Sequence, residues 1–283
     1  NTVRANDLLI DHKPKGQDHD IQVDSCRSCG SKELEPVLDL GSPCISDFIL
    51  PGESEYHVPL ELLYCDRCGL VQLHHSVDRG WLYKDYYYLS GTNESMVDAL
   101  HDVVHNAMQY VELVEGDVVI DIGSNDGTLL KQYPEHLFRL GFEPSYSMLH
   151  YMEGTTIGIH PSFFPPACTW DQLIPVKAKI ITSIAMFYDL DNPNEFVHAI
   201  SEWLADDGVW VVQFQGLEDM LAMNAFDNIC HEHLLYISRQ PFEYMLHNHG
   251  LQIEDIRYNN VNGGSIRYII KHGTAVHPYV VLG

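Results

Sequence analysis

The segment Val118-Val-Ile-Asp121-Ile-Gly123-Ser-Asn125-Asp-Gly127-Thr decides the fold of this 283-residue chain. Its apolar start predicts a short buried strand, and the glycines that follow predict a tight turn into a helix whose start spans Gly127–Tyr133. Gly123 permits close approach of the backbone to a ligand, and the free N–H groups at a helix start bind polar ligand atoms. The segment therefore predicts a ligand-binding turn after a buried strand.

A carboxylate follows the next apolar run. Glu143 comes directly after a second predicted strand, 138–142, about 20 residues beyond Asp121, where an acid accepts the hydroxyls of a ribose. Asn125 stands where a GxGxxG motif has its middle glycine, so a methionine-bearing nucleoside is favoured over a dinucleotide. Asp121, Gly123, Asn125 and Glu143 are the predicted contacts. An ordinary strand, turn and helix without a ligand is the alternative interpretation.

Strands and helices alternate through the rest of the chain. Further strands are predicted at 180–184 and 209–214, with a helix over 194–204 between them. A helix over 95–113 precedes the first strand, and a helix over 242–249 leads to terminal strands at 251–256 and 265–270. This order predicts an α/β fold with a doubly wound, mostly parallel sheet.

Two CxxC pairs lie ahead of this domain, at Cys26-Arg-Ser-Cys29 and Cys65-Asp-Arg-Cys68. Each pair places two thiolates on one tight turn, and four thiolates complete a tetrahedral zinc site without an open position. The surrounding residues 21–79 are rich in turns and poor in apolar residues, so this small module needs a metal to hold it. Redox-active or unpaired cysteines are the alternative.

Cys230-His231-Glu232-His233 is the third pattern. Two histidines at i and i+2 lie on opposite faces of a helix, so this is not the HExxH of a zinc protease. A histidine beside a carboxylate suits a general base, because imidazole titrates near neutral pH and the acid stabilises the imidazolium. Structural histidines that cap a helix are the alternative, and a second metal site is a weaker one.

The charge balance limits the partners. Sixteen Lys and Arg against forty Asp and Glu give a formal net charge of −24, which disfavours nucleic acid and anionic membrane surfaces. Adaptation to a salty environment would also account for this charge. The chain has seven cysteines, and this odd number favours metal ligation over paired disulfides. It has no run of eighteen apolar residues, the length that a membrane-spanning helix needs. We therefore expect a cytoplasmic protein that crosses no membrane.

With these motifs the chain resembles the S-adenosylmethionine-dependent C-methyltransferases that act on keto-sugar nucleotides in deoxysugar biosynthesis. The resemblance rests on the CxxC pairs, the segment after Asp121 and the His-Glu-His segment, together with Tyr88-Leu-Ser-Gly-Thr92-Asn-Glu94 and Asn262-Gly-Gly-Ser-Ile-Arg267. It implies a zinc module packed on a Rossmann-like methyltransferase domain. The family has Tyr where Cys230 stands, and it continues into a further C-terminal domain beyond the point that corresponds to Gly283.

The resemblance implies residue roles. His233 is the base, with Glu232 and His231 beside it as further catalytic candidates, and Thr92 and Ser183 join the cofactor contacts. Tyr83, Tyr87 or Asn228 is expected to stabilise an enolate oxygen, the Ser183–Asp189 segment to line the cofactor pocket, and Arg267 to contact an acceptor phosphate. The expected organisation is a polar leader over 1–20, the zinc module over 21–79 and the methyltransferase domain over 80–283. A partner chain or a further domain is expected to complete the nucleotide site.

Three functions follow as hypotheses. The first is methyl transfer to a carbon alpha to the ketone of a nucleotide-linked keto-deoxysugar, through a base-generated enolate. The second is O- or N-methylation of another small-molecule or polyketide-type acceptor. The third is a non-catalytic module that binds S-adenosylmethionine within a larger assembly.

Overall fold

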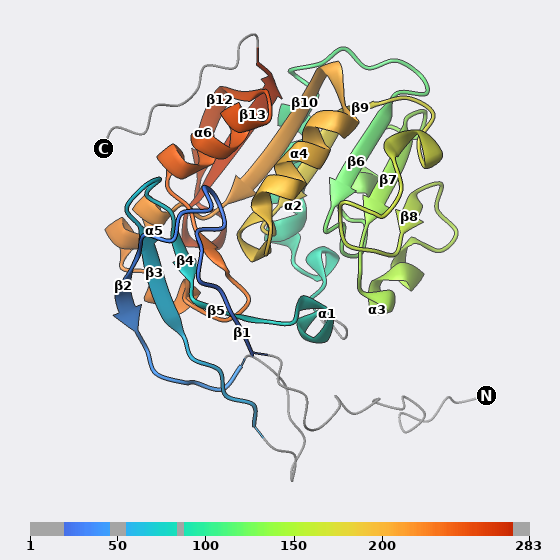
Figure 1. Ribbon diagram of the computed structural model, residues 1–283. Helices are drawn as coiled ribbons and strands as arrows, with labels where there is room; N and C mark the ends of the chain where they lie inside the picture. The colour runs from blue at the N-terminus through green and yellow to red at the C-terminus, as the bar shows by residue number, and fades with distance from the viewer. Residues whose placement is uncertain (1–19, 46–54, 84–87, 274–283) are drawn as a thin grey trace, which may run out of the picture.

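The computed structural model describes residues 20–45, 55–83 and 88–273, so residues 1–19 of the predicted leader and Tyr87 lie outside the described residues. A seven-stranded sheet forms the centre, in the order β12-β13-β10-β9-β6-β7-β8 (Figure 1). Its strands are β6 (Val118–Ile122), β7 (Phe138–Phe142), β8 (Gly158–His160), β9 (Ala178–Ile184), β10 (Leu204–Phe214), β12 (Leu251–Asn259) and β13 (Ser265–His272). Every predicted strand of this domain is present, within a few residues of its expected ends.

The sheet is doubly wound, as predicted. From β6 the chain moves outward in one direction to β7 and β8, and then returns to add β9 and β10 on the other side. All these neighbours pair in parallel, whereas β13 pairs antiparallel with both β10 and β12. The carboxyl ends of β6, β7, β9 and β10 therefore lie along one edge, where ligands bind in open α/β sheets.

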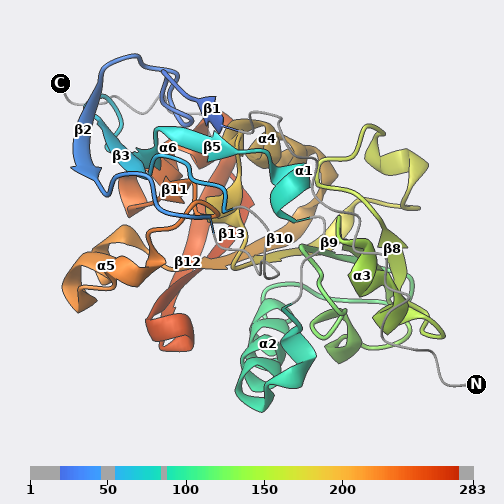
Figure 2. The same ribbon diagram turned by 90° about the horizontal axis from the view of Figure 1, so that it is seen from below.

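Helices cover both faces of this sheet (Figure 2). On one face α2 (Glu94–Ala107) packs Leu100 and Val103 against Val119 and Val211. On the other face lie α4 (Pro193–Trp203) and α6 (Arg239–Asn248). The remaining helices are short: α1 (Arg79–Leu82), α3 (Tyr146–Leu149), α5 (Leu217–Met223) and the 3-10 helices η1 (Ser90–Thr92), η2 (Leu130–Gln132), η3 (His150–Met152), η4 (Trp170–Gln172), η5 (Phe187–Asp189), η6 (Phe226–Asn228) and η7 (Val261–Gly263).

The prediction of a helix that starts over Gly127–Tyr133 is wrong. The chain forms turns there and the single 3-10 turn η2. Gly127 takes φ 73°, and Pro134 disfavours a helical conformation for the residue before it, so fewer than two turns of helix fit between these positions. The ligand-binding turn is therefore followed by a short irregular connection.

A second, four-stranded sheet carries the cysteine module, in the order β11-β4-β3-β2. Its strands are β2 (Leu34–Asp39), β3 (Glu61–Cys65), β4 (Val71–Leu73) and β11 (Leu235–Tyr236), and β1 (Asp20–Gln22) pairs separately with β5 (His75–Val77). Strand β11 comes from far along the chain, directly after the His-Glu-His segment. Residues beyond the predicted 79/80 boundary thus belong to the sheet of the cysteine module.

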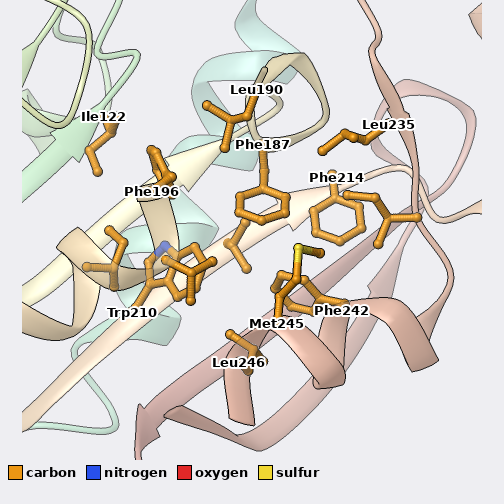
Figure 3. Close-up of a cluster of buried hydrophobic side chains, with 14 of the residues drawn as sticks. Ile122, Phe187, Leu190, Phe196, Trp210, Phe214, Leu235, Phe242, Met245 and Leu246 are labelled. Atoms are coloured by element: carbon orange, nitrogen blue, oxygen red, sulfur yellow. The ribbon is translucent and has the colours of Figure 1, made fainter. Parts of the chain in front are cut away.

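One continuous core joins the two sheets. Figure 3 shows Leu235 of β11 close to Phe187 and Phe214, which lie at the carboxyl-end edge of the central sheet. Phe242 of α6 packs edge-on against Phe187, with ring centroids 5.3 Å apart. The cysteine module is therefore packed onto the edge where a ligand is expected. No helix in the described part of the chain combines the length and the apolar character needed to cross a membrane.

Candidate functional site

The four predicted metal ligands meet at one point. The Sγ atoms of Cys26 and Cys68 are 3.5 Å apart, as are those of Cys29 and Cys65, and all four lie within 4.8 Å of one another. A tetrahedron with Zn–S bonds of about 2.3 Å has edges of about 3.8 Å, so this cluster fits zinc. Burial raises the pKa of Cys29 to about 11, so a bound cation is needed to keep it a thiolate.

The two metal-binding turns have the same construction. The N–H of Gly30 donates to the Cys26 carbonyl at 2.9 Å, and the N–H of Gly69 donates to the Cys65 carbonyl at 2.8 Å. Both glycines have φ near +70 to +80°, which side chains disfavour. With no position left for water or substrate, bound zinc would be a structural crosslink between residues 26–29 and 65–68.

A cavity of about 350 Å³ opens at the carboxyl ends of β6, β7 and β9. We call it the strand-end cavity. Of the predicted cofactor contacts, Asp121, Gly123, Asn125 and Glu143 all line it. Its other walls come from the 79–100 region, from residues 162–164 and from the segment after β9, and include Arg79, Tyr83, Tyr88, Ser90, Phe163, Met186, Tyr188 and Asp189.

Glu143 is held rigidly in this cavity. Its Oε2 accepts the N–H of Asn125 at 2.8 Å, and its Oε1 accepts the N–H of Ser145 at 2.8 Å. The residue is 5% exposed, and this burial raises the pKa of Glu143, while the two backbone donors oppose the rise. Each carboxylate oxygen has a second lone pair for a ligand hydroxyl, which is the arrangement a ribose requires.

Asp121 is more deeply enclosed. Its Oδ1 accepts the Thr182 hydroxyl at 2.6 Å, and burial raises the pKa of Asp121 to about 7, with a smaller contribution from the charge of Glu143. The carboxyl group is therefore partly protonated near neutral pH when no cation is bound. A cationic ligand in the cavity would favour its ionised form.

Residues 88–91 are tied to the turn after β6. Asn125, which has φ 51°, accepts the Ser90 N–H at 3.0 Å and donates to the Tyr88 carbonyl at 2.8 Å. The N–H of Gly91 donates to Asp126 Oδ2 at 2.8 Å. The side chain of Asn125 thus holds a wall of the cavity, rather than being free to contact a ligand.

A second space of about 250 Å³, the His233 chamber, adjoins the first. Met96, Ile184, Ala185, Tyr188 and Asn262 line both spaces. The chamber is completed by residues from the end of β10, from β11, from the start of β13 and from the segments between these strands, namely Gln213, Phe214, Gln215, Met220, Asn228, His233, Leu235, Tyr236, Val261 and Ser265. Two ligands could therefore meet at the shared wall.

His233 presents one defined nitrogen to this chamber. Its Nδ1 lies 2.8 Å from the Asn228 carbonyl oxygen, which can only accept, so Nδ1 carries the proton and Nε2 has a free lone pair. The ring packs on Tyr188, with centroids 4.3 Å apart. Burial lowers the pKa of His233, which keeps the imidazole neutral, while the Asn228 carbonyl and the charge of Glu232 oppose this shift.

The three residues that precede His233 in the sequence do not line either space. His231 is 2% exposed, and its Nε2 lies 3.0 Å from the Val58 carbonyl in the cysteine module, so it faces away from both spaces. Glu232 lines neither space, and its buried Oε2 has no hydrogen-bond partner among the described residues. Burial raises the pKa of Cys230 to about 12, so this residue is a neutral thiol.

The two described candidates for the enolate oxygen lie on different sides. Asn228 lines the His233 chamber, whereas Tyr83 lines the strand-end cavity. Beside Tyr83, enclosure raises the pKa of Asp189 well above its ordinary value, and hydrogen bonding from the Tyr83 hydroxyl opposes this rise.

Three predicted contacts lie elsewhere. Ser183 is fully buried and accepts the Trp210 indole N–H at 2.6 Å, so its side chain faces the core. Thr92 is exposed and donates to the Leu89 carbonyl at 2.8 Å. Arg267 is 2% exposed, with Nη1 2.8 Å from Asp102 Oδ2, and it is therefore not available to an acceptor phosphate.

Gln213, Gln215 and Tyr236 also line the chamber and were not among the predicted site residues. The two glutamines lie at the end of a predicted strand in a parallel sheet, which is the position that signals a ligand contact. Tyr236 carried no such signal, because nothing in the local sequence shows that β11 joins the sheet of the cysteine module.

Two family models match the chain. One, described as a zinc binding domain, matches residues 26–83, and the other, described as a methyltransferase domain, matches residues 93–256. The C-methyltransferase NovU of Streptomyces niveus is 27% identical over 262 residues, in a match that covers 90% of this chain. The match spans 62% of NovU, less than two thirds of that protein.

A solved structure has the same fold. An S-adenosylmethionine-dependent methyltransferase from Clostridium acetobutylicum superposes with a TM-score of 0.50 at 14% identity, over 62% of this chain and 92% of that one. The strand-end cavity fits S-adenosylmethionine, because Glu143 offers acceptors for the ribose hydroxyls and Asp121 offers a carboxylate to a cation. Since the methyltransferase-domain match covers more than half of its 283 residues, the chain belongs to the methyltransferase-domain family.

Proposed function

We propose that this protein is a C-methyltransferase that acts on a carbon alpha to a ketone, in an acceptor of the keto-deoxysugar class. The observation that carries the proposal is the unprotonated Nε2 of His233, in a chamber that shares a wall with the cofactor cavity. The relative NovU is itself named a C-methyltransferase, which supports the same reaction.

His233 acts as the general base. Its Nε2 takes the proton from the alpha carbon, and the electron pair of the broken C–H bond moves onto the carbonyl oxygen to give an enolate. Glu232 stabilises the imidazolium that results, because its charge already favours the protonated ring. The amide of Asn228, which lines the same chamber, is the candidate to donate to the enolate oxygen. S-adenosylmethionine supplies the electrophilic methyl group.

The chamber lining supports a neutral, hydroxylated ring as the acceptor. No Lys, Arg, Asp or Glu is among the described residues that line it. Gln215 Nε2 and the Tyr236 hydroxyl are buried in this wall and make no hydrogen bond within the described part of the chain. Such unpaired groups favour a ligand that carries its own hydroxyl or carbonyl groups. A nucleotide attached to that ring would extend beyond the chamber.

The test is exchange of the alpha proton with solvent. Zinc-loaded protein with S-adenosylhomocysteine should catalyse deuterium uptake from D₂O into a keto-deoxysugar nucleotide, followed by mass spectrometry. His233→Gln should abolish the uptake and leave S-adenosylhomocysteine affinity unchanged, whereas the exposed control His136→Gln should keep both. Methylation of a hydroxyl without any deuterium uptake would instead indicate an O-methyltransferase and refute the proposed enolate.

A further inference from the structure

The segment that carries His233 lies between the two sheets and forms hydrogen bonds on both sides. On the central-sheet side, the N–H of Leu234 donates to the Tyr188 carbonyl at 2.8 Å, and the N–H of Leu217 donates to the Ile237 carbonyl at 3.0 Å. On the other side, the N–H of Leu73 donates to the Leu234 carbonyl at 2.9 Å. The position of His233 is therefore set from two directions.

The bonds from the cysteine module are close to the metal ligands. Strand β11 pairs with β4, in the register Leu235 opposite Gln72 and Tyr236 opposite Val71, and β4 begins three residues after Cys68. Two residues before His233, the His231 ring is fixed to the Val58 carbonyl by its Nε2 at 3.0 Å. The sheet that contains β11 thus also contains Cys65, at the end of β3, and its strand β4 follows Cys68 closely.

Gln72 joins this sheet to the first metal-binding turn. It is fully buried, its Oε1 accepts the Arg27 N–H at 2.7 Å, and its Nε2 donates to the Ser25 carbonyl at 3.1 Å. One side chain therefore links the turn that carries Cys26 and Cys29 to the strand that pairs with Leu235.

The three polar side chains expected to hold the cofactor have their hydrogen bonds elsewhere. The hydrogen bonds of Asp121, Asn125 and Glu143 go to residues between 88 and 182, all within the methyltransferase domain. Loss of order in the cysteine module would consequently affect the two halves of the active site unequally.

We propose that Gln72 and His231 are positioning residues through which the zinc site holds His233 in place, so that zinc controls the acceptor half of the active site and leaves the cofactor half intact. The inference rests on the proposed function of His233 as the base. Zinc then acts on the reaction without contacting any reacting group.

Three measurements test the inference on the full chain: S-adenosylhomocysteine affinity by calorimetry, deuterium uptake into the ketone, and the pKa of His233 from its imidazole NMR signal. That signal is identified by its absence in His233→Gln. The groups that face the His233 ring are the Asn228 carbonyl, Tyr188 and the carboxylate of Glu232.

Removal of zinc, and separately His231→Ala, should slow deuterium uptake about 100-fold, since misplacement by about 1 Å costs that much. The pKa of His233 should rise towards its ordinary 6.5 as water reaches the ring, while cofactor affinity stays unchanged. His231→Gln should restore the rate, because its amide N–H can donate to Val58. Gln72→Ala, which keeps all four cysteines, should act like His231→Ala.

If the zinc-free protein, His231→Ala and Gln72→Ala all lose both cofactor affinity and deuterium uptake, the inference is overturned, because zinc would then support the whole fold. An unchanged His233 pKa and exchange rate after zinc removal would also overturn it. If the native protein shows no exchange at all but zinc removal still shifts the pKa of His233, the inference stands and the proposed function fails.

Discussion

Asp121→Asn is expected to change the pH dependence of stability. The carboxyl group is 4% exposed at the end of the central strand β6, and its pKa is raised from 3.8 to about 7. Asparagine has nearly the same shape and keeps an oxygen that can accept the Thr182 hydroxyl. The substitution therefore removes the ionisation and leaves the packing nearly unchanged.

The sign and size follow from linkage. The folded protein holds the proton of Asp121 more tightly than the unfolded chain, so the free energy of unfolding falls as the pH rises from about 4 to 7. At about 1.4 kcal/mol for each pH unit between the two pKa values, the full loss is about 4 kcal/mol. About 3 kcal/mol of it falls between pH 5 and pH 8.

Urea unfolding at pH 5, 6, 7 and 8, with zinc present and no cofactor, measures this effect. Between pH 5 and pH 8, the free energy of unfolding of Asp121→Asn should rise by about 3 kcal/mol relative to that of the native protein. The exposed control Asp206→Asn should show no such gain. A stability difference between Asp121→Asn and the native protein that is the same at pH 5 and pH 8 would refute the reasoning, whatever its absolute size.

Further predictions concern the two halves of the site. Glu143→Gln should weaken S-adenosylhomocysteine binding about 10- to 150-fold in calorimetry, because a hydrogen bond to a charged group contributes about 1.5–3 kcal/mol. The exposed Glu153→Gln is the control. An unchanged affinity of Glu143→Gln would show that Glu143 does not bind the ribose. Gly91→Ala should lower the free energy of unfolding by about 1–3 kcal/mol in urea, since its Cβ would lie 2.8 Å from Asp126 Oδ2, and full stability would show that residues 88–91 move aside freely. The acid limb of kcat/KM should have its midpoint below pH 6.5, because burial lowers the pKa of His233, and a midpoint above 6.5 would contradict that burial.

Local sequence patterns predicted much of this fold. Val118–Ile122 is an unbroken apolar run apart from Asp121, and it became the central strand with the expected bounds. The CxxC pairs predicted the four-sulfur cluster, because the turn geometry of each pair is local. Glu143 was found because a strand end in a parallel sheet faces the ligand edge.

Side-chain direction on fully buried strands was harder to predict. Ser183 lies on β9, which is covered on both faces, so its neighbours do not alternate between apolar and polar in a way that shows which side faces a ligand. Arg267 followed a glycine pair that suggested a ligand loop, yet its charge pairs with Asp102 from a distant helix. Long-range pairing of this kind leaves no local signal, and the same holds for β11.

Strand β11 lies within the methyltransferase domain in sequence but pairs with the sheet of the cysteine module, and this matters for recombination. A chimera that replaces residues 21–79 with the corresponding segment of a relative would leave Leu235 and Tyr236 to pair with a foreign β4. Grafts that carry residues 229–237 along with the N-terminal segment should fold and retain turnover more often than grafts that do not. The unit that can be swapped between relatives is thus discontinuous in sequence. Gene-shuffling experiments that aim to change acceptor specificity should transfer both segments together.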